Sequence, residues 1–446
     1  MDEPRSPGIV WFRRDLRLED NPAWGAATSR HDEVTALFVI DAALWNRTIG
    51  RRTALLAENL RMLDRSLAAR GGRLRVEHGD PTTVVPHIAR TLRAAVHANA
   101  DFTPYASKRD AAVAASATTE WHHGLTVHPI GAVTKADGTL YMVFTPFAEA
   151  WRRRPLEGSP VPGTARLTAD PGSGVPSAGP PPMVGGEEAA RTRFKDFLSR
   201  VDSYPDIRDR PDLDETSHLS IDLKYGTLSP RAVAAAVEDE RGWPFVRQLA
   251  WRDFHAALMA DNPNLVDHAM KPAYDRIPWI DDDAGFESWC AGETGYPIVD
   301  AGMRQLRETG WMHNRVRMIT ASFLTKHLLI DWRRGERFFR RHLLDADTAV
   351  NAGNWQWVAG SGADAAPYFR VFNPVSQARK HDPDGAYIRR WVPELAGVPA
   401  PHVHAPWAAG TSDLAGSRAR IDYPAPIVEH SAARERALAA YRSALG

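Results

Sequence analysis

The densest group of chemically useful side chains lies in one short segment of the C-terminal half. Acids, an amide and indoles follow one another within thirteen residues, in the order Asp345-x-Asp347-x-x-x-Asn351-x-Gly353-x-Trp355-Gln356-Trp357. Carboxylates and amides can hydrogen-bond a polar ligand, and indoles can stack on a flat ring. Core packing explains any one of these tryptophans, but a structural helix does not require the whole combination. The segment therefore predicts a site for an aromatic ligand.

A basic stretch precedes this segment. Residues 304–341 hold ten basic side chains and three acids, although the whole chain is balanced at 55 basic and 55 acidic residues. A local excess of positive charge is what a polyanion would need, and a solvated helix surface explains it equally well. The basic residues are Arg304, Arg307, Arg315, Arg317, Lys326, Arg333, Arg334, Arg337, Arg340 and Arg341.

Composition narrows the class of protein. The chain is 43% hydrophobic and 25% charged, and it has no apolar run of about eighteen residues that could span a bilayer. The polar start, Met1 to Pro7, lacks the pattern of a signal peptide, so we expect a cytoplasmic protein. The single cysteine, Cys290, excludes an intramolecular disulfide and a multi-cysteine metal site. Redox chemistry would need a bound cofactor, and we expect no metal.

The elements that must position these residues fall into two classes. Short apolar segments alternate with helical patterns in the first 130 residues, which predicts an α/β domain with a doubly wound parallel sheet. The residues after the first strand, Arg13-Arg14-Asp15-Leu16-Arg17, contain no glycine-rich dinucleotide motif. The predicted strands are Ile9–Phe12, Val34–Ile40, Leu74–Val76, Ala94–Ala98 and Leu125–Ile130.

The rest of the chain predicts a connector and an all-α domain. Periodicity disappears in a Pro- and Gly-rich region between Pro155 and Glu187, and helical spacing dominates beyond it. At 446 residues the chain is too long for a single core. The expected domains are residues 1–130 (α/β), 131–190 (linker) and 191–446 (helical), with a closing helix near Ala432 to Leu445.

Several long motifs resemble the photolyase/cryptochrome family. They are Trp11-Phe12-Arg13-Arg14-Asp15-Leu16-Arg17, Gly310-Trp311-Met312-His313-Asn314-Arg315-Val316-Arg317-Met318, the segment from Asp345 to Trp357, Phe372-Asn373-Pro374 and Trp391-Val392-Pro393-Glu394-Leu395. The resemblance covers nearly the whole chain and is nearest to bacterial class I photolyases, which act on cyclobutane pyrimidine dimers. It implies an antenna domain, a long linker, a helical FAD-binding domain and light-dependent DNA repair.

The resemblance implies which residues bind FAD. Arg317 would stabilise a reduced, anionic flavin, Asp345 would hold that arginine, and Asn351 would face the flavin ring. A neutral amide at that position favours repair over signalling. The implied FAD-binding residues are Tyr204, Thr216, Ser217, Leu219, Ser220, Arg252, Arg317, Asp345, Asp347 and Asn351.

The resemblance also implies catalytic, electron-transfer and DNA-binding residues. The dimer would be flipped out of the duplex into a pocket walled by Trp251 and Trp357. The implied catalytic residues are Asn351, Gln248, Trp251 and Trp357; the electron-transfer residues are Trp279, Trp332 and Trp355; the DNA-binding residues are Trp251, Asn314, Arg315, Met318 and Trp357.

Three alternatives remain open. The first is a (6-4) photolyase, because Gln248 stands where photolyases of cyclobutane dimers commonly have glutamate, and glutamine also occurs in (6-4) photolyases. Against that alternative, His313-Asn314 lacks their second histidine. A cryptochrome-like photoreceptor is the second alternative, and a flavin dehydrogenase is the third.

A second, antenna chromophore is common in the family. Asp41, Arg51, Asp101 and Lys224 resemble positions that hold 8-hydroxy-deazaflavin, with methenyltetrahydrofolate as the other candidate. An ordinary solvated lysine would explain Lys224 equally well. The expected partner is UV-damaged DNA, with no membrane, and we expect a monomer.

Overall fold

The structure is a computed structural model that describes residues 6–46, 50–237, 239–409 and 422–445. The chain forms two compact units, each made of two segments. Unit 1 comprises Met1–Asp202 and Ser217–Asn264, and unit 2 comprises Ser203–Thr216 and Leu265–Gly446. The short 3₁₀ helices η1 (Val201–Ser203) and η3 (Pro263–Val266) lie where the chain passes from one unit to the other.

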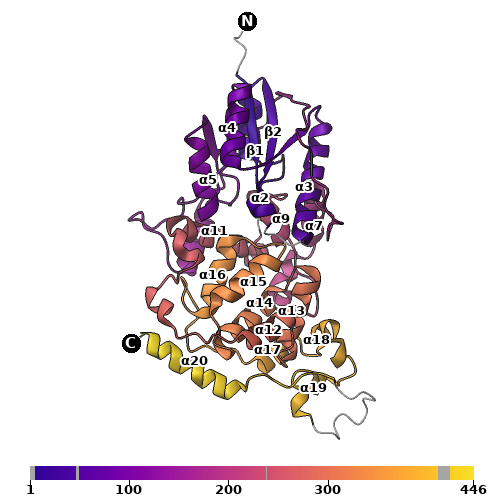
Figure 1. Cartoon of the computed structure of the whole chain (residues 1–446), viewed down its shortest axis with the longest axis vertical. Helices are drawn as coiled ribbons and strands as arrows, with labels where there is room; N and C mark the ends of the chain where they lie inside the picture. Colours follow the sequence, from indigo (N-terminus) through magenta and orange to yellow (C-terminus); the bar gives the residue numbers. More distant parts are fainter. Residues whose placement is uncertain (1–5, 47–49, 238, 410–421, 446) are drawn as a thin grey trace. The chain divides into compact units, whose positions relative to one another are not determined.

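Unit 1 is built on a parallel sheet, whose strands and covering helices can be followed in Figure 1. The strand order is β3-β2-β1-β4-β5, and the short strand β6 pairs with β2. This confirms the predicted doubly wound parallel sheet. The strands are β1 (Gly8–Phe12), β2 (Glu33–Ile40), β3 (Leu74–His78), β4 (Ala95–Asn99), β5 (Thr119–His122) and β6 (Arg166–Leu167).

Both faces of the sheet are buried, which explains the continuous apolar strands. Alternate residues of β1 enter different clusters: Val10 and Phe12 pack with one, and Ile9 and Trp11 with the other. The helices of unit 1 are α1 (Pro22–Arg30), α2 (Ala42–Trp45), α3 (Gly50–Ala68), α4 (Pro81–Leu92), α5 (Pro104–Ala114), α6 (Phe144–Arg153), α7 (Glu187–Leu198), α9 (Ser220–Tyr225), α10 (Pro230–Ala235), η2 (Glu240–Gly242) and α11 (Trp243–Asp261).

The strand predicted at Leu125–Ile130 is wrong, and the fifth strand is Thr119–His122. The backbone N–H groups of Val127 and His128 instead donate to the Asp253 carboxylate, at 3.0 and 3.2 Å. The Trp151 indole donates to the same carboxylate at 2.9 Å. The segment is therefore fixed by a side chain of α11 and not by a neighbouring strand, which no local pattern could reveal.

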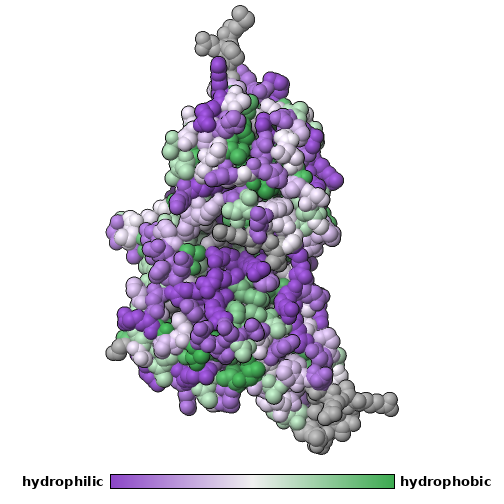
Figure 2. Space-filling view, in the orientation of Figure 1, coloured by the Kyte–Doolittle hydropathy of each residue, from purple (hydrophilic) through white to green (hydrophobic). Residues whose placement is uncertain are grey.

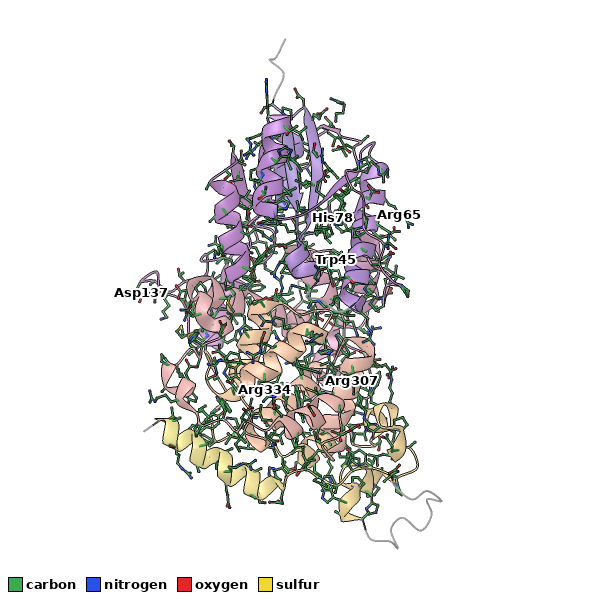
Figure 3. The ribbon with its side chains drawn as sticks, viewed as in Figure 1. Trp45, Arg65, His78, Asp137, Arg307 and Arg334 are labelled. Atoms are coloured by element: carbon green, nitrogen blue, oxygen red, sulfur yellow. The ribbon has the colours of Figure 1, made fainter. Side chains whose placement is uncertain are left out.

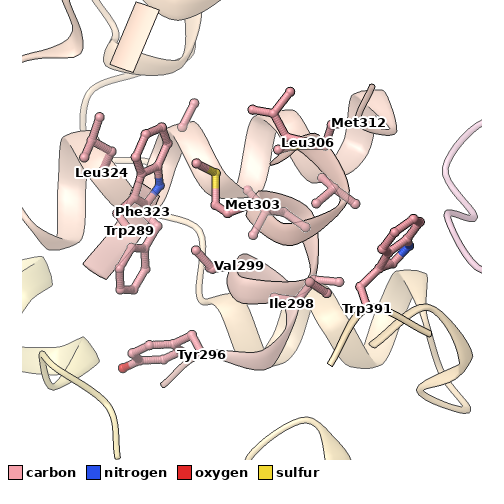
Figure 4. Close-up of a cluster of buried hydrophobic side chains, with 14 of the residues drawn as sticks. Trp289, Tyr296, Ile298, Val299, Met303, Leu306, Met312, Phe323, Leu324 and Trp391 are labelled. Carbon is pink, nitrogen blue, oxygen red and sulfur yellow. The ribbon is translucent and has the colours of Figure 1, made fainter. Parts of the chain in front are cut away.

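Unit 2 is helical, as the periodicity predicts, around a large apolar core that is partly drawn in Figure 4. Trp289, Val299 and Phe323 are fully buried in it. The elements are α8 (Tyr204–Ile207), η4 (Pro272–Arg276), α12 (Asp283–Ala291), α13 (Pro297–Thr309), α14 (Asn314–Ser322), the π-helix η5 (Phe323–His327), α15 (Trp332–His342), α16 (Thr348–Ala359), α17 (Pro374–His381), α18 (Ala386–Trp391), η6 (Pro393–Leu395), α19 (Ala400–Val403), η7 (Pro406–Ala408) and α20 (His430–Leu445).

The predicted basic stretch carries less free charge than its sequence suggests. Arg334, labelled in Figure 3, binds Asp281 and Asp283 at 3.0 and 2.6 Å, and Lys326 is buried with its ammonium 3.5 Å from the centre of the Tyr441 ring. Burial lowers the pKa of Lys326 to about 7. The basic residues of the stretch that form ion pairs are Arg304, Arg315, Arg317, Arg333, Arg334 and Arg340.

Hydrophilic residues cover much of the face seen in Figure 2, and hydrophobic areas lie between them. Among the exposed large hydrophobic residues are Val161, Val184 and Phe369. Within the described ranges, no helix combines the length and the apolar character that crossing a bilayer requires.

Candidate functional site

Arg317 and Asp345 form a two-point ion pair between α14 and the residues just before α16. Nη1 and Nη2 of Arg317 donate to the two carboxylate oxygens at 3.1 and 2.8 Å, and Nε donates to the Met312 carbonyl at 2.7 Å. The Asp345 side chain is 3% exposed and that of Arg317 is 24% exposed. These bonds use three of the five guanidinium N–H groups and fix the plane of the fork, so two remain to bind a ligand.

The side chain of Asn351 is held by Glu336, which the sequence indicates only as one of three acids in the basic stretch. Its Nδ2 donates to the side-chain Oε1 and the backbone carbonyl of Glu336, at 2.8 and 3.1 Å. Glu336 is 1% exposed, and its other oxygen lies 3.3 Å from Arg340. Because both amide protons point to Glu336, the Asn351 carbonyl oxygen is the atom left to face a ligand. Only the i, i+4 spacing of Glu336 and Arg340 hints at this arrangement in the sequence.

Asp347 caps α16, and the two tryptophans of this helix differ in their burial. Asp347 caps α16 by accepting from the N–H groups of Ala349 and Val350 at 3.1 and 3.2 Å. Trp355 is 2% exposed in the core, whereas Trp357 is partly exposed. Residues two apart lie on different sides of a helix. One helix therefore buries the Trp355 indole fully and leaves the Trp357 indole, which packs against the same core, partly exposed.

The three predicted electron-transfer tryptophans all belong to the apolar core of unit 2. Trp332 and Trp355 are buried in it, and Trp279 packs against it. The structure adds Trp289, whose ring centroid lies 6.2 Å from that of Trp355 in an edge-to-face contact. Nothing in the local spacing around Trp289 distinguishes it from an ordinary core residue.

The predicted pocket residues of unit 1 lie on α11. Gln248 donates from Nε2 to the Pro244 carbonyl at 3.0 Å, which directs its Oε1 away from the helix backbone. Trp251 is partly exposed and stacks on Phe144, with ring centroids 3.6 Å apart and planes 12° apart. Phe144, at the start of α6, was not predicted, and it holds the indole in a fixed plane. Arg252 donates to the backbone carbonyls of Leu125 and Leu223.

The predicted phosphate-binding residues lie on both sides of the boundary between the units. Tyr204 and Thr216 are in unit 2, whereas Ser217, Leu219 and Ser220 are in unit 1. Within unit 1, the Leu219 N–H donates to the Ser217 hydroxyl at 3.4 Å. Ser220 is exposed at the start of α9.

Three of the predicted DNA-binding residues of unit 2 lie along α14, and the fourth, Trp357, is on α16. Asn314 is exposed, Met318 is partly exposed one turn further, and the two side chains touch at 3.9 Å. Arg315 binds Asp209 through two nitrogens, with contacts of 2.9 to 3.2 Å. Burial raises the pKa of Asp209, but the Arg315 guanidinium outweighs it and the pKa stays below its ordinary value.

The predicted antenna residues lie in unit 1, and two of them follow parallel strands. Asp41 comes directly after β2, caps α2 through the Ala43 N–H at 2.8 Å and accepts from the Tyr105 hydroxyl. Asp101 follows β4 and lies 3.6 Å from Arg14. Ligands of such sheets bind beyond the carboxyl ends of the strands. Arg51 is in the first turn of α3 and Lys224 in the last turn of α9.

Comparison with known families identifies both parts of this chain. Residues 8–165 match the DNA photolyase family, and residues 245–443 match the FAD-binding domain of DNA photolyase. The chain belongs to the photolyase family. The deoxyribodipyrimidine photo-lyase of Halobacterium salinarum is 40% identical over 98% of this chain and 99% of its own length, and that of Escherichia coli is 39% identical over 98% of each.

Solved structures agree with this assignment. A class III photolyase from Agrobacterium tumefaciens matches with a TM-score of 0.92 and 37% identity over 100% of this chain and 99% of its own. An archaeal photolyase from Sulfolobus tokodaii that holds two FAD molecules matches with a TM-score of 0.86 and 32% identity, over 98% and 100%. The cryptochrome of Synechocystis matches with 0.87 and 29%, over the same shares.

The residues of unit 2 fit an FAD group. The guanidinium of Arg317 is fixed and partly exposed, and it can bind an anionic ring. The Asn351 carbonyl oxygen can accept a hydrogen bond from a ring N–H. The donor set of the site therefore agrees with the FAD-binding family that the sequence matches.

Glu336 should make the stability of the protein depend on pH. Burial raises its pKa above the ordinary value of 4.5, so the folded state holds this proton more tightly than the unfolded state and stability falls as pH rises from that value. Glu336→Gln has no carboxyl group to titrate, so the variant should not lose stability in this way as the pH rises. In urea denaturation at several pH values, we expect the variant to become more stable relative to wild type as the pH rises from acid to neutral.

The control for this measurement is Glu308→Gln, which changes an exposed glutamate of the same unit. Its free energy of unfolding should follow the wild-type pH curve. A pH-independent difference between Glu336→Gln and wild type would contradict the assignment of this proton.

Proposed function

We propose that the protein repairs cyclobutane pyrimidine dimers in DNA with light, by electron transfer from excited reduced FAD. The observation that carries the proposal is the buried neutral amide of Asn351, oriented by Glu336, in a chain whose full-length relatives are deoxyribodipyrimidine photo-lyases. A neutral amide suits repair, as the sequence resemblance implies.

In this proposal the protein binds and orients while the cofactor does the chemistry. Reduced, anionic FAD, when bound, would supply the light-driven electron transfer on which the splitting of the dimer depends. Arg317 stabilises the negative charge, and Asp345 keeps the guanidinium in place. Asn351 would accept a hydrogen bond from the ring, and Tyr204 and the stretch from Thr216 to Ser220 would bind the phosphates. Asp347 fixes the start of α16.

The damaged DNA would bind through stacking and backbone contacts. A dimer has already lost much of its base stacking, so flipping it out costs less than flipping intact bases. Trp251 and Trp357 would stack on it, Gln248 would hydrogen-bond a pyrimidine edge, and Asn314 and Met318 would line the pocket. Arg315 can still reach a phosphate because a guanidinium has more donors than Asp209 uses, and such contacts give affinity without sequence preference.

A second chromophore at the carboxyl edge of the sheet would extend light absorption. Asp41, Arg51, Asp101 and Lys224 offer acidic and basic groups there. Our first candidate is 8-hydroxy-deazaflavin, and methenyltetrahydrofolate is the second. The second FAD of the Sulfolobus tokodaii relative adds a third candidate, to be distinguished by mass spectrometry of the released chromophore.

The decisive experiment is a repair assay on defined oligonucleotides. Chemically reduced protein is illuminated with blue light in the presence of DNA that carries either a cyclobutane dimer or a (6-4) photoproduct. We expect restoration of the cyclobutane dimer only. Repair of the (6-4) lesion would assign the function that Gln248 leaves open, and DNA binding without repair would favour a cryptochrome-like photoreceptor.

Trp251→Ala should weaken binding to dimer-containing DNA while FAD stays bound. Loss of one stacking face costs ~1–3 kcal/mol, which is about a five- to 150-fold change in affinity. Fluorescence anisotropy with a labelled oligonucleotide measures it. Trp243→Ala is the matched control, because it removes a partly buried indole from the first turn of the same helix. Equal losses in both variants would refute the pocket role of Trp251.

Trp355→Phe should slow the photoreduction of oxidised flavin but spare repair by chemically reduced protein. Phenylalanine fills most of the space but is a much poorer one-electron relay than indole. Absorbance during illumination measures the first rate, and the oligonucleotide assay measures the second. Trp289→Phe is the control, since Trp289 contacts Trp355 in the same core and lies outside the proposed chain of Trp355, Trp332 and Trp279. An equal slowing by Trp289→Phe would contradict that chain.

A further inference from the structure

Unit 1 contains a group of histidines that the proposed function does not use. His97 on β4 and Glu120 and His122 on β5 direct ligand atoms to one point, all within 4.8 Å of one another. The His97 Nδ1 atom lies 3.1 Å from Nε2 of His122 and 3.9 Å from a carboxylate oxygen of Glu120. His31, just after α1, contacts the far side of the His97 ring.

The sheet register brings these side chains to one face. His97 is paired with Glu120 across two parallel strands, and paired residues point to the same side. His122 is two residues beyond Glu120, so it points to that side as well. The face is the one on which Val10 and Phe12 pack, because His97 pairs with Val10 of β1 on its other side. Two adjacent strands therefore fix three ligand atoms without any loop.

A chain of hydrogen bonds sets the protonation of these rings. Nδ1 of His31 lies 2.6 Å from the Ser6 carbonyl, which can only accept, so this nitrogen carries the proton. Nε2 of His31 is then an acceptor, and the His97 Nε2–H donates to it at 2.9 Å. The Nδ1 atom of His97 therefore directs its lone pair at His122 and Glu120 and accepts a hydrogen bond from the His122 Nε2–H, which a metal ion would have to displace. A metal-binding histidine commonly has its other N–H held in this way.

The geometry points to a binding site for a divalent transition-metal ion such as Zn²⁺, with His97 Nδ1, His122 Nε2 and the Glu120 carboxylate as ligands and His31 as the residue that orients His97. Two imidazole nitrogens bound to tetrahedral zinc are about 3.3 Å apart, close to the observed 3.1 Å. Three ligands leave a fourth position for water.

The structure shows how a metal ion could reach this site and which side chain would compete with it for Glu120. His97 is fully buried, whereas the Glu120 side chain is 44% exposed, so an ion can enter from the Glu120 side. Arg30, at the end of α1, forms an ion pair with the same Glu120 oxygen that faces His97. This guanidinium neutralises the carboxylate and competes with a cation. Removal of Arg30 should therefore strengthen metal binding, an effect that a purely structural histidine cluster would not produce.

The test is equilibrium dialysis of the flavin-loaded full-length protein against Zn²⁺ at micromolar free concentration, with elemental analysis of bound metal and calorimetry for affinity. We expect wild type to bind one Zn²⁺ per chain. His122→Gln and Glu120→Gln should bind at least about tenfold more weakly, and His31→Gln about tenfold more weakly through lost orientation. Arg30→Gln should bind more tightly than wild type.

His123→Gln is the matched control, because it makes the same change at the exposed histidine next to His122. It should bind zinc like wild type, and flavin content and circular dichroism should report a native fold in every variant compared. Absence of bound zinc in wild type, or wild-type affinity in both His122→Gln and Glu120→Gln, would overturn the proposal. Loss of binding in His123→Gln alone would assign the ion to a different surface site and would overturn it as well.

Discussion

Two buried side-chain pairs fix the positions of α14, α15 and α16, and the candidate cofactor residues depend on them. Arg317 is bound to Asp345 at two points, and Asn351 is bound to Glu336 through both amide protons. Loss of one partner from a buried ion pair costs about 3–5 kcal/mol, so such pairs tolerate little displacement. The same contacts that pack the helices therefore orient the guanidinium and the amide oxygen toward a ligand.

The parallel sheet of unit 1 carries candidate ligand-binding residues at two different places. The carboxyl ends of β2 and β4 lead to Asp41 and Asp101, where sheets of this type bind ligands. The face that carries His97 holds a separate polar cluster, built by register and not by loops. The later segment that returns to unit 1 brings α11, and Asp253 anchors that helix to Val127, His128 and Trp151. Trp251 and Gln248 thus rest on a helix with a buried polar anchor.

The basic stretch, residues 304–341, is less positively charged in the folded protein than its sequence suggests. The stretch 304–341 looks strongly basic along the chain, yet acids distant in sequence pair with Arg304, Arg315 and Arg334. Lys326 leaves the surface altogether and contacts Tyr441. Ion pairing and burial therefore reduce the positive charge that these helices offer to DNA.

The sequence by itself determined the fold class, the position of most strands and helices, and the family, because hydrophobic period and long motifs are local. It also predicted Arg317, Asp345 and Asn351 as cofactor-binding residues, since they lie in two continuous motifs that resemble the family. It failed at Leu125–Ile130 and did not reveal Glu336, Phe144, Trp289 or the pairing of His97 with Glu120. Each of these depends on a contact between residues distant along the chain, and only tertiary packing decides which distant side chains meet.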